Sequence, residues 1–308
     1  MEDSTFRVIH KLYIFTHHGQ DEICYNFVPK LPSSFSTFGE TMLFVIDIGN
    51  THTVAGIIEE LNLTRQWRIK TDAAMTADEL AIMYHNLFKM AGIDCSTVSA
   101  VVLSSVVPQL ESAYFNCCSG LFKETDGLEL INVCSEKVAD IITVKLNNPA
   151  EVGADRLVNG IGAFHLCRSN AIVVDFGTAI TFDCISEQCE YLGGLILPGL
   201  HVSLGALSQK AAKLPQIDLH VPPDKVIGTN TVTAMKSGVL FGYGAMIEGL
   251  IQKVSEEMSQ TGYPDPAVIA TGGMASLLLD YAPSIQRLEP NLTLNGLAII
   301  HQLLRSHT

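Results

Sequence analysis

The chain has little charge, and most of the charge it has is negative. Only 17% of its 308 residues are charged, against about 25% in a typical globular protein. Asp and Glu (32) outnumber Lys and Arg (19), so the net charge is -13. Hydrophobic residues make up 47%, which excludes a disordered chain, because disorder requires low hydrophobicity. The negative balance argues against a nucleic-acid partner, since a phosphate backbone needs basic residues opposite it.

Long apolar runs and paired cysteines are missing as well. No apolar stretch reaches the about 18 residues that a membrane span requires, and the N-terminus lacks the basic-then-apolar pattern of a signal peptide. The eight cysteines contain no CxxC pair, the spacing used by many zinc and redox sites. We therefore expect a cytoplasmic protein with no membrane partner, in which most cysteines are buried free thiols.

The first 41 residues differ from the rest of the chain. They are polar and rich in turn-forming residues, with no sustained helical or strand periodicity, and an apolar strand then begins abruptly at Met42. We interpret residues 1–41 as a poorly structured extension or a misplaced start. The alternative is a short genuine N-terminal element. The pair His17-His18 has no Cys or carboxylate at ligand spacing nearby, which favours an exposed loop over a metal site.

From Met42 onward, short β-rich runs alternate with helical patterns, as in α/β proteins. Thr76 and Glu79 form a capping-box pattern at the start of one predicted helix, which Gly92 ends. The run Asn148–Glu151 predicts a second helix, with a capping Asn and a proline at the first helical position. Strands are predicted at 98–103, 129–133, 171–175, 178–185 and 267–271.

An internal repeat links two distant parts of the chain. Residues 45–51 (VIDIGNT) resemble residues 173–179 (VVDFGTA), and in both an apolar strand ends in Asp-x-Gly before a second strand begins. Asp and Gly are ordinary turn residues, so chance is one explanation. The matching strands on both sides favour another: two related halves, each opening with a hairpin that places an Asp and a Gly turn at the cleft between them.

Such a turn is suited to binding phosphate. Glycine lets the backbone bend sharply and approach a ligand, and backbone N–H groups with Asn50, Thr51 and Thr178 can donate to phosphate oxygens. The Asp at the strand end could hold Mg²⁺. The alternative is a pair of tight hairpins in which Asp only satisfies turn amides. Two copies facing each other favour phosphate, and no Walker or dinucleotide glycine pattern competes.

Two further segments are candidates for the site. The turn Gly272–Gly273 follows an apolar strand and could let a base or ribose lie against backbone, although strand–glycine–helix junctions are common. In 153–156 (GADR), early in the second predicted helix, Asp155 could take a proton while Arg156 holds an anion. Glu151 and Asn159 would share that polar face. Spacing alone favours the plainer alternative, a solvated helix face with an ordinary charge pair.

Six motifs in order resemble the type III pantothenate kinases, members of the actin/hexokinase/Hsp70-like superfamily. They are DIGNTHT (47–53), NPAEVGADR (148–156), DFGTAITFD (175–183), GGLILPG (193–199), IGTNTVTAMKSG (227–238) and ATGG (270–273). The resemblance covers residues 42–308. It implies an α/β fold of two related actin-like (ribonuclease H-like) halves, 42–165 and 166–308, around an ATP cleft.

The resemblance implies ATP-dependent phosphorylation of pantothenate to 4'-phosphopantothenate, the first step of coenzyme A biosynthesis. It further implies ATP with Mg²⁺, a monovalent cation (K⁺ or NH₄⁺) and a homodimer. The implied catalytic base is Asp155, and the implied monovalent-cation ligand is Asp175. Asp47 would lie near a Mg²⁺ ion that is bound through phosphate. The ATP-binding residues would be Asp47, Ile48, Gly49, Asn50, Thr51, His52, Thr53, Val54 and Thr178, with Gly272 and Gly273 beside them. The substrate-binding residues would be Leu146, Gly153, Ala154, Asp155, Arg156 and Thr231.

One departure from the family pattern leaves alternatives open. Many relatives carry a Tyr lining the substrate site where this chain has Leu146, so substrate affinity is in question. One alternative is therefore an actin-fold kinase for a different small hydroxy compound. Another is a regulatory or transcription-accessory protein, a role that degraded acidic positions would favour. Asp47, Asp155 and Asp175 are all present, which favours an enzyme.

Overall fold

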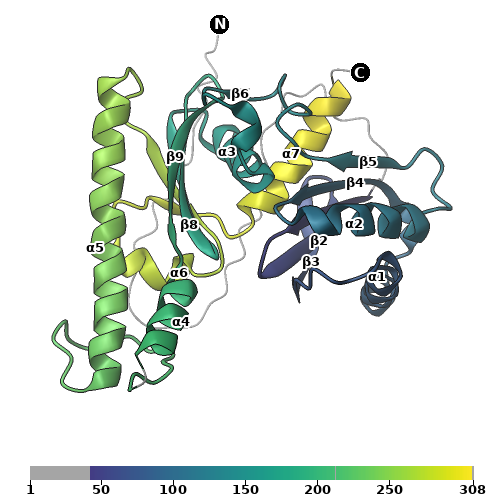
Figure 1. Cartoon of the computed structure of the whole chain (residues 1–308). Helices are drawn as coiled ribbons and strands as arrows, with labels where there is room; N and C mark the ends of the chain where they lie inside the picture. The colour runs from purple at the N-terminus through teal and green to yellow at the C-terminus, as the bar shows by residue number, and fades with distance from the viewer. Residues whose placement is uncertain (1–41, 212, 307–308) are drawn as a thin grey trace, which may run out of the picture.

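The computed structural model describes residues 42–211 and 213–306. The sequence predictions for residues 1–41, including the pair His17-His18, lie outside the described residues. Within them, the fold consists of two mixed β-sheets with helices between and around them (Figure 1).

The first sheet contains five strands in the order β3-β2-β1-β4-β5. Strands β1, β2 and β3 form an antiparallel meander, and β4 and β5 continue the sheet parallel to β1. The bounds of these strands are Met42–Ile48, His52–Glu59, Asn62–Lys70, Val98–Ser105 and Glu129–Asn132.

The second sheet repeats this arrangement and adds one strand, in the order β11-β10-β7-β8-β9-β6. Here β7, β8 and β9 form the antiparallel meander, and β10 and β11 run parallel to β7. The bounds are Thr143–Val144 for β6, then Ala171–Phe176, Ala179–Ile185, Glu190–Pro198, Ala267–Thr271 and Arg287–Leu288. Because five strands recur in the same order and direction, the fold is that of two actin-like halves, which confirms the predicted fold class.

Helices occupy three layers around the two sheets (Figure 1). Helices α1 (Ala77–Ala91) and α2 (Pro108–Leu121) cover the outer face of the first sheet. Helices α3 (Ala154–Cys167) and α7 (Leu292–Ser306) pack on each other between the sheets. The outer face of the second sheet is covered by α4 (Leu200–Lys210), α5 (Thr231–Gln260) and α6 (Ala275–Leu278). Three short 3₁₀ turns, η2 (Cys95–Thr97), η3 (Pro149–Glu151) and η4 (Leu279–Tyr281), complete the described elements.

The first strand of each half is buried on both faces. Along β1, Phe44 and Ile46 pack toward the outer helices, whereas Val45 packs toward α3 and α7. The same alternation recurs in β7, where Val174 packs outward and Val173 inward. Strands covered on both faces read as continuous apolar runs, which explains why the repeat stands out in the sequence.

The second predicted helix begins at Asn148 and Pro149 as predicted, but its predicted continuation through Asp155 is wrong. Asn148 Oδ1 accepts a hydrogen bond from the Ala150 N–H, as expected of a cap, but the helix that it caps is only the single 3₁₀ turn η3. The backbone of Val152 is extended (φ -75°, ψ 125°) and its side chain is buried in the cluster between the sheets. Gly153 then acts as the N-cap of α3. Burial of Val152 therefore interrupts the helix, and Asp155 lies in the first turn of a separate one.

Other predicted elements are confirmed. Thr76 and Glu79 form the capping box of α1, and Gly92 ends that helix in the left-handed region (φ 70°). All five predicted strands are present, with small shifts at their ends. The seven cysteines within the described ranges are free, and four of them are buried. No described helix combines the length and the apolar character needed to cross a membrane.

The boundary at residue 165 stays a prediction; it falls within α3, and two other elements pack with the half on the opposite side of it. Strand β6 precedes the boundary but pairs with β9 in the second sheet. Helix α7 follows the boundary, yet it packs against β1, β2 and β4 of the first sheet. The two halves are therefore tied together by segments exchanged between them.

Candidate active site

The turns of the two repeated hairpins lie against each other. Thr51 follows β1 and Thr178 follows β7, and their hydroxyl oxygens are 2.8 Å apart. Both residues are exposed. The two Asp-x-Gly turns thus face each other across the halves, as the repeat predicts.

A threonine outside the predicted site holds the first turn. The Thr71 hydroxyl donates to the Gly49 carbonyl oxygen (2.7 Å), and the Thr71 N–H donates to the Thr51 carbonyl oxygen (3.0 Å). Buried Thr53 contacts the Thr71 hydroxyl at 3.0 Å. A Cβ on Gly49 would lie 2.8 Å from the His52 carbonyl oxygen, so this position requires glycine. Thr71 directly follows β3, and no motif in the sequence identifies it.

Asp47, near the end of β1, is held by a neighbouring strand. The Ser104 hydroxyl of β4 donates to Asp47 Oδ1 at 2.7 Å, and Ser104 is fully buried. Burial raises the pKa of Asp47 to about 7, the Ser104 hydrogen bond opposes this, and the charge of Asp155 adds to it. The carboxylate is therefore poorly stabilised as an anion and is suited to a nearby cation.

Asp175, the equivalent residue in β7, is held by the helices between the sheets. Asn159 of α3 donates from Nδ2 to Asp175 Oδ2 at 3.1 Å, and Thr293 of α7 donates to Asn159 Oδ1 at 2.7 Å. Asn159 is almost fully buried. Its predicted place on a solvated polar face with Glu151 is therefore wrong, because the interlayer packing brings that face of α3 against β7.

The Gly272–Gly273 turn packs directly on Asp175. A Cβ on Gly272 would lie 2.4 Å from Asp175 Oδ1 and 2.6 Å from the Phe176 nitrogen, and its φ is 91°. Both the conformation and the close approach require glycine. The structure thus brings this turn to the same place as the two Asp-x-Gly turns.

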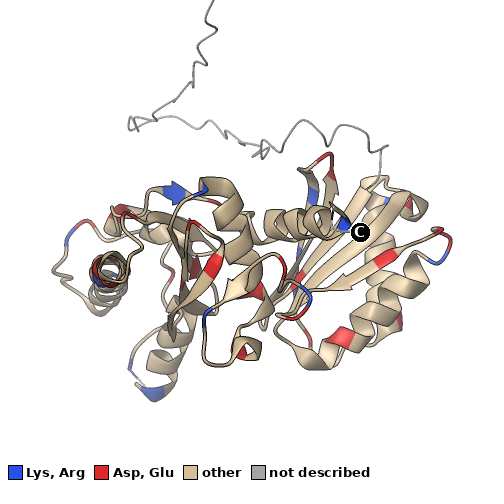
Figure 2. Cartoon of the chain, turned by 90° about the horizontal axis from the view of Figure 1, so that it is seen from above, with Lys and Arg blue, Asp and Glu red and all other residues tan. Residues whose placement is uncertain are grey.

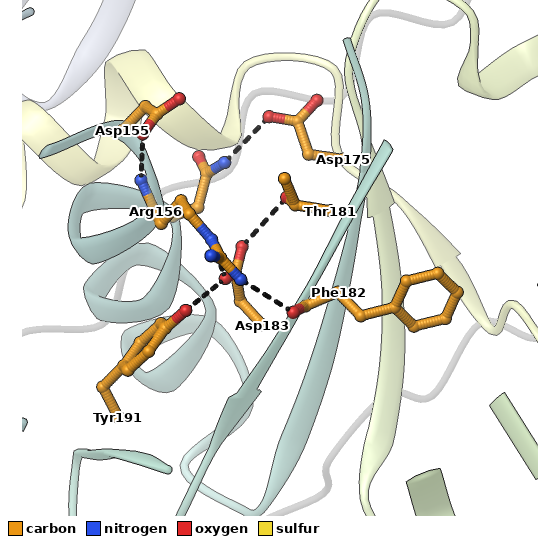
Figure 3. A network of polar contacts seen from close by, with 8 residues as sticks. Asp155, Arg156, Asp175, Thr181, Phe182, Asp183 and Tyr191 are labelled. Carbon is orange, nitrogen blue, oxygen red and sulfur yellow. Dashed lines mark hydrogen bonds and ion pairs between the residues drawn. The ribbon is translucent and has the colours of Figure 1, made fainter. Parts of the chain in front are cut away.

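Asp155 and Arg156 begin α3 and point to different partners (Figure 3). The Arg156 N–H donates to Asp155 Oδ1 at 2.8 Å, whereas its side chain donates from Nε to Asp183 Oδ1 at 2.6 Å. Arg156 Nη2 also donates to the Phe182 carbonyl oxygen at 3.1 Å. The alternative of an ordinary solvated Asp155–Arg156 charge pair is therefore wrong, because the guanidinium is paired with a different carboxylate.

Asp183 is fully buried and has three partners. Besides Arg156, it accepts from the Tyr191 hydroxyl (2.7 Å) and from the Thr181 hydroxyl (3.2 Å). Burial raises the pKa of Asp183 to about 6, whereas Arg156, first among several neighbours, acts in the opposite direction. The sequence offers no sign of this pair, since its members come from a helix and a strand 27 residues apart.

Four carboxylates, which we call the acidic cluster, gather at this point: Asp47, Asp155, Asp175 and Asp183. Burial raises the pKa of Asp155, and burial together with the charges of the other three raises that of Asp175 to about 7. Hard oxygen donors with excess negative charge fit a bound cation. The described residues contain no ready-made group of three or more such side chains placed to hold a metal ion.

Of two further predicted substrate residues, Leu146 lies beside the segment of β9 that pairs with Asp183, and Thr231 lies at the start of α5. Leu146 is half-buried against the apolar cluster between the sheets, and a Cβ on Gly193 would lie 3.6 Å from its side chain. Thr231 is the exposed first residue of α5. No hydrogen bond or ion pair among the described residues joins Thr231 to the acidic cluster.

The repeated strand order and the paired Asp-x-Gly turns define a member of the actin-like superfamily of phosphotransferases and ATPases. Residues 43–253 match the family model for type III pantothenate kinase. Type III pantothenate kinases from Desulfotalea psychrophila and from Geobacter sp. are 46% and 42% identical over 86% and 85% of this chain and 99% of each relative. The chain belongs to the type III pantothenate kinase family.

Proposed function

We propose that the chain transfers the γ-phosphoryl group of ATP to the primary hydroxyl of pantothenate. The product would be 4'-phosphopantothenate, in the first step of coenzyme A biosynthesis. Family membership supports this substrate pair. The observation that carries the proposal is the contact between Thr51 and Thr178. This contact brings the two Asp-x-Gly turns together beside the acidic cluster.

The nucleotide would lie between the two hairpin turns. Residues 47–54 would hold phosphate oxygens from the first half, and Thr178 would do so from the second. Fixed backbone amides and hydroxyls stabilise charge that develops on a transferring phosphoryl group. The Gly272–Gly273 turn, which packs on Asp175, would accommodate the ribose or base.

Asp155 would be the general base. The Arg156 N–H fixes one of its oxygens, and Figure 3 shows the other on the side facing Asp175. Its raised pKa makes it a stronger base than an ordinary Asp. It would accept the proton of the substrate hydroxyl as the new O–P bond forms. The bond between the γ-phosphorus and the bridging oxygen then breaks, and its electron pair leaves with ADP.

Asp47 would lie near a Mg²⁺ ion that is bound to the ATP phosphates, and Asp175 would hold K⁺ or NH₄⁺. The carboxylate chemistry of the acidic cluster fits both groups. When bound, such cations neutralise the negative charge of the phosphates. The chain's own contribution is to hold the carboxylates in place, through Ser104 in one half and Asn159 in the other.

Pantothenate would contact 153–156, Leu146 and Thr231. Arg156 donates from Nε to Asp183 and from Nη2 to the Phe182 carbonyl oxygen. Its Nη1 makes no hydrogen bond within the described residues. We infer that Nη1 serves the substrate carboxylate, while the other nitrogens fix the guanidinium. Leu146 supplies an apolar wall in place of a hydrogen-bonding one.

We also infer a homodimer. Around α4 and α5, several large apolar side chains are exposed, namely Val202, Leu207, Val226, Ile227 and Val232. Gly238 and Gly242 leave open space on α5, because a Cβ there would meet no other atom within 4 Å. Light scattering of the purified full chain would test the stoichiometry, and a monomer at micromolar concentration would refute the dimer.

The central test is pantothenate-dependent ADP release by the purified full chain with MgATP, in KCl and in NaCl. We expect activity that is higher in KCl. Asp155→Asn should lower kcat about 10²–10⁴-fold, the usual contribution of a general base. Glu151→Gln, in the neighbouring turn η3, serves as the matched control and should retain activity.

The possible failures are distinguishable. No ADP release with pantothenate in either salt would refute the assignment, and release with another hydroxy compound instead would support the alternative raised by Leu146. A fully active Asp155→Asn enzyme would refute only the assignment of Asp155 as the general base.

A further inference from the structure

A cationic side chain lies at the junction of the two halves, apart from the acidic cluster. Arg68 extends from β3 of the first half, and its Nη2 is 3.4 Å from Nδ1 of His52 at the start of β2. A Cβ on Gly273 would lie 3.0 Å from Arg68 Nη2 and 3.1 Å from Nη1. The guanidinium therefore rests against the glycine turn of the second half, in the space that a side chain at position 273 would occupy.

The neighbours of Arg68 orient it without neutralising it. A guanidinium can only donate hydrogen bonds, so His52 Nδ1 acts as the acceptor. Burial, followed by the charges of Arg68 and His201, lowers the pKa of His52, which favours the neutral ring. Lys and Arg are scattered along the ribbon (Figure 2), and no ion pair within the described residues involves Arg68. Its positive charge is thus available to a ligand.

The flanking residues indicate the class of that ligand. On one side is His52, part of the first phosphate turn, and on the other is Gly273, part of the turn proposed for ribose or base. A group between these two points of a bound nucleotide is phosphate, and a guanidinium is well matched to phosphate because it donates two parallel hydrogen bonds. Arg156, by contrast, is the cation paired within the acidic cluster, where transfer takes place.

We propose that Arg68 binds the α- and β-phosphates of the nucleotide and thereby bridges the two halves across it. The inference rests on the proposed function and adds to it a cation that the chain itself supplies. The competing explanation is structural: Arg68 only orients His52. The two explanations predict different binding data. If Arg68 binds phosphate, its loss weakens the binding of nucleotides but not of nucleosides, which carry no phosphate.

The test uses the full chain and calorimetric titration with MgADP and with adenosine, alongside steady-state kinetics. For Arg68→Gln we expect the Kd for MgADP and the KM for MgATP to rise about tenfold or more, the usual effect of removing a charge-assisted hydrogen bond. The Kd for adenosine should not change. Arg68→Lys should recover part of the affinity, since it keeps the charge but loses the paired donors. Arg65→Gln, on the same strand, is the matched control.

Each outcome bears on the proposal. An unchanged MgADP affinity in Arg68→Gln, with wild-type chain that phosphorylates pantothenate, would overturn the inference and leave the proposed function intact. Equal weakening of MgADP and adenosine would indicate a structural role and would also overturn it. A wild-type chain that binds MgADP through Arg68 but transfers nothing to pantothenate would instead overturn the proposed function alone.

Discussion

The two Asp-x-Gly hairpins share their strand pairing but differ in what covers the second strand. In the first, Val45 pairs with Gly56, and a Cβ there would lie 3.1 Å from the Leu294 side chain of α7. In the second, Val173 pairs with Asp183, which binds Arg156 of α3. One register position thus carries an apolar contact in one half and a buried ion pair in the other.

The carboxylates at the ends of the first strands differ in the same way. Asp47 is held by Ser104 of the adjacent strand, within its own sheet. Asp175 is held by Asn159, which is held by Thr293, so its position depends on both interlayer helices. The strand repeat places the two Asp residues, whereas the helices between the sheets determine their different surroundings.

The largest difference between the halves should appear in the unfolding free energy, at the equivalent positions Gly56 and Asp183. Asp183→Ala leaves the largely buried Arg156 without its partner, which typically costs about 3–5 kcal/mol of unfolding free energy. Gly56→Ala forces the side-chain ends of Leu63 and Leu294 and the Arg65 carbonyl oxygen to move, at about 1–3 kcal/mol. Urea unfolding of both variants would measure this. A smaller loss for Asp183→Ala would show that the ion pair contributes little.

A second difference should appear in the pH dependence of stability. Asp47 and Asp175 have folded pKa values of about 7, above the ordinary 3.8. Their contribution to stability is therefore full below pH about 4 and is lost as pH rises through about 7. Asp175→Asn should raise the Tm by a few kelvin at pH 8 and leave it unchanged at pH 4. A variant less stable than wild type at pH 8 would contradict this.

The side chains that hold the two carboxylates form a matched pair of tests. Asn159→Ala removes two hydrogen bonds, one to each neighbour, and should lower kcat about tenfold. Ser104→Ala removes one and should act mainly on the KM for MgATP, by about threefold to tenfold. Steady-state kinetics would separate these effects. Identical effects on both parameters would remove the distinction between the halves.

The smallest difference should come from the glycines of the turns. A Cβ on Gly49 would lie 2.8 Å from a carbonyl oxygen, and one on Gly177 would lie 3.3 Å from another. Gly49→Ala must therefore shift the backbone and should raise the KM for MgATP several-fold. Gly177→Ala should stay within about twofold, because a few tenths of an ångström relieve the contact. A larger effect at Gly177 would show that the second turn is the more rigid one.

The sequence alone predicts the fold because its main signals are local. Apolar strands ending in Asp-x-Gly identify both hairpins, and the Thr76–Glu79 capping box identifies α1. The start of α3 is not predictable this way, since Asn148 and Pro149 satisfy every local rule for a helix start. What overrides them is the burial of Val152 between the sheets, which is a property of the tertiary structure.

The turns of the site could be predicted from the sequence, but the hydrogen bonds that hold its carboxylates could not. Gly49, Asp47 and Asp175 follow from the motif itself. The partners Ser104 and Asn159 come from other elements, 57 and 16 residues along the chain from the carboxylates they hold. Ser and Asn of this kind are common on strands and helices, so only the packing of α3 and β4 distinguishes them.

The exchange of α7 between the halves has a consequence for biosynthesis. The ribosome delivers β1 and β4 early, but the helix that packs on their inner face is the last described element to emerge. Until then, the apolar inner side of the first sheet lacks part of its cover. We therefore expect the N-terminal half to complete its packing only after α7 has been synthesised, and a chain truncated before residue 292 to be exposed to aggregation and proteolysis.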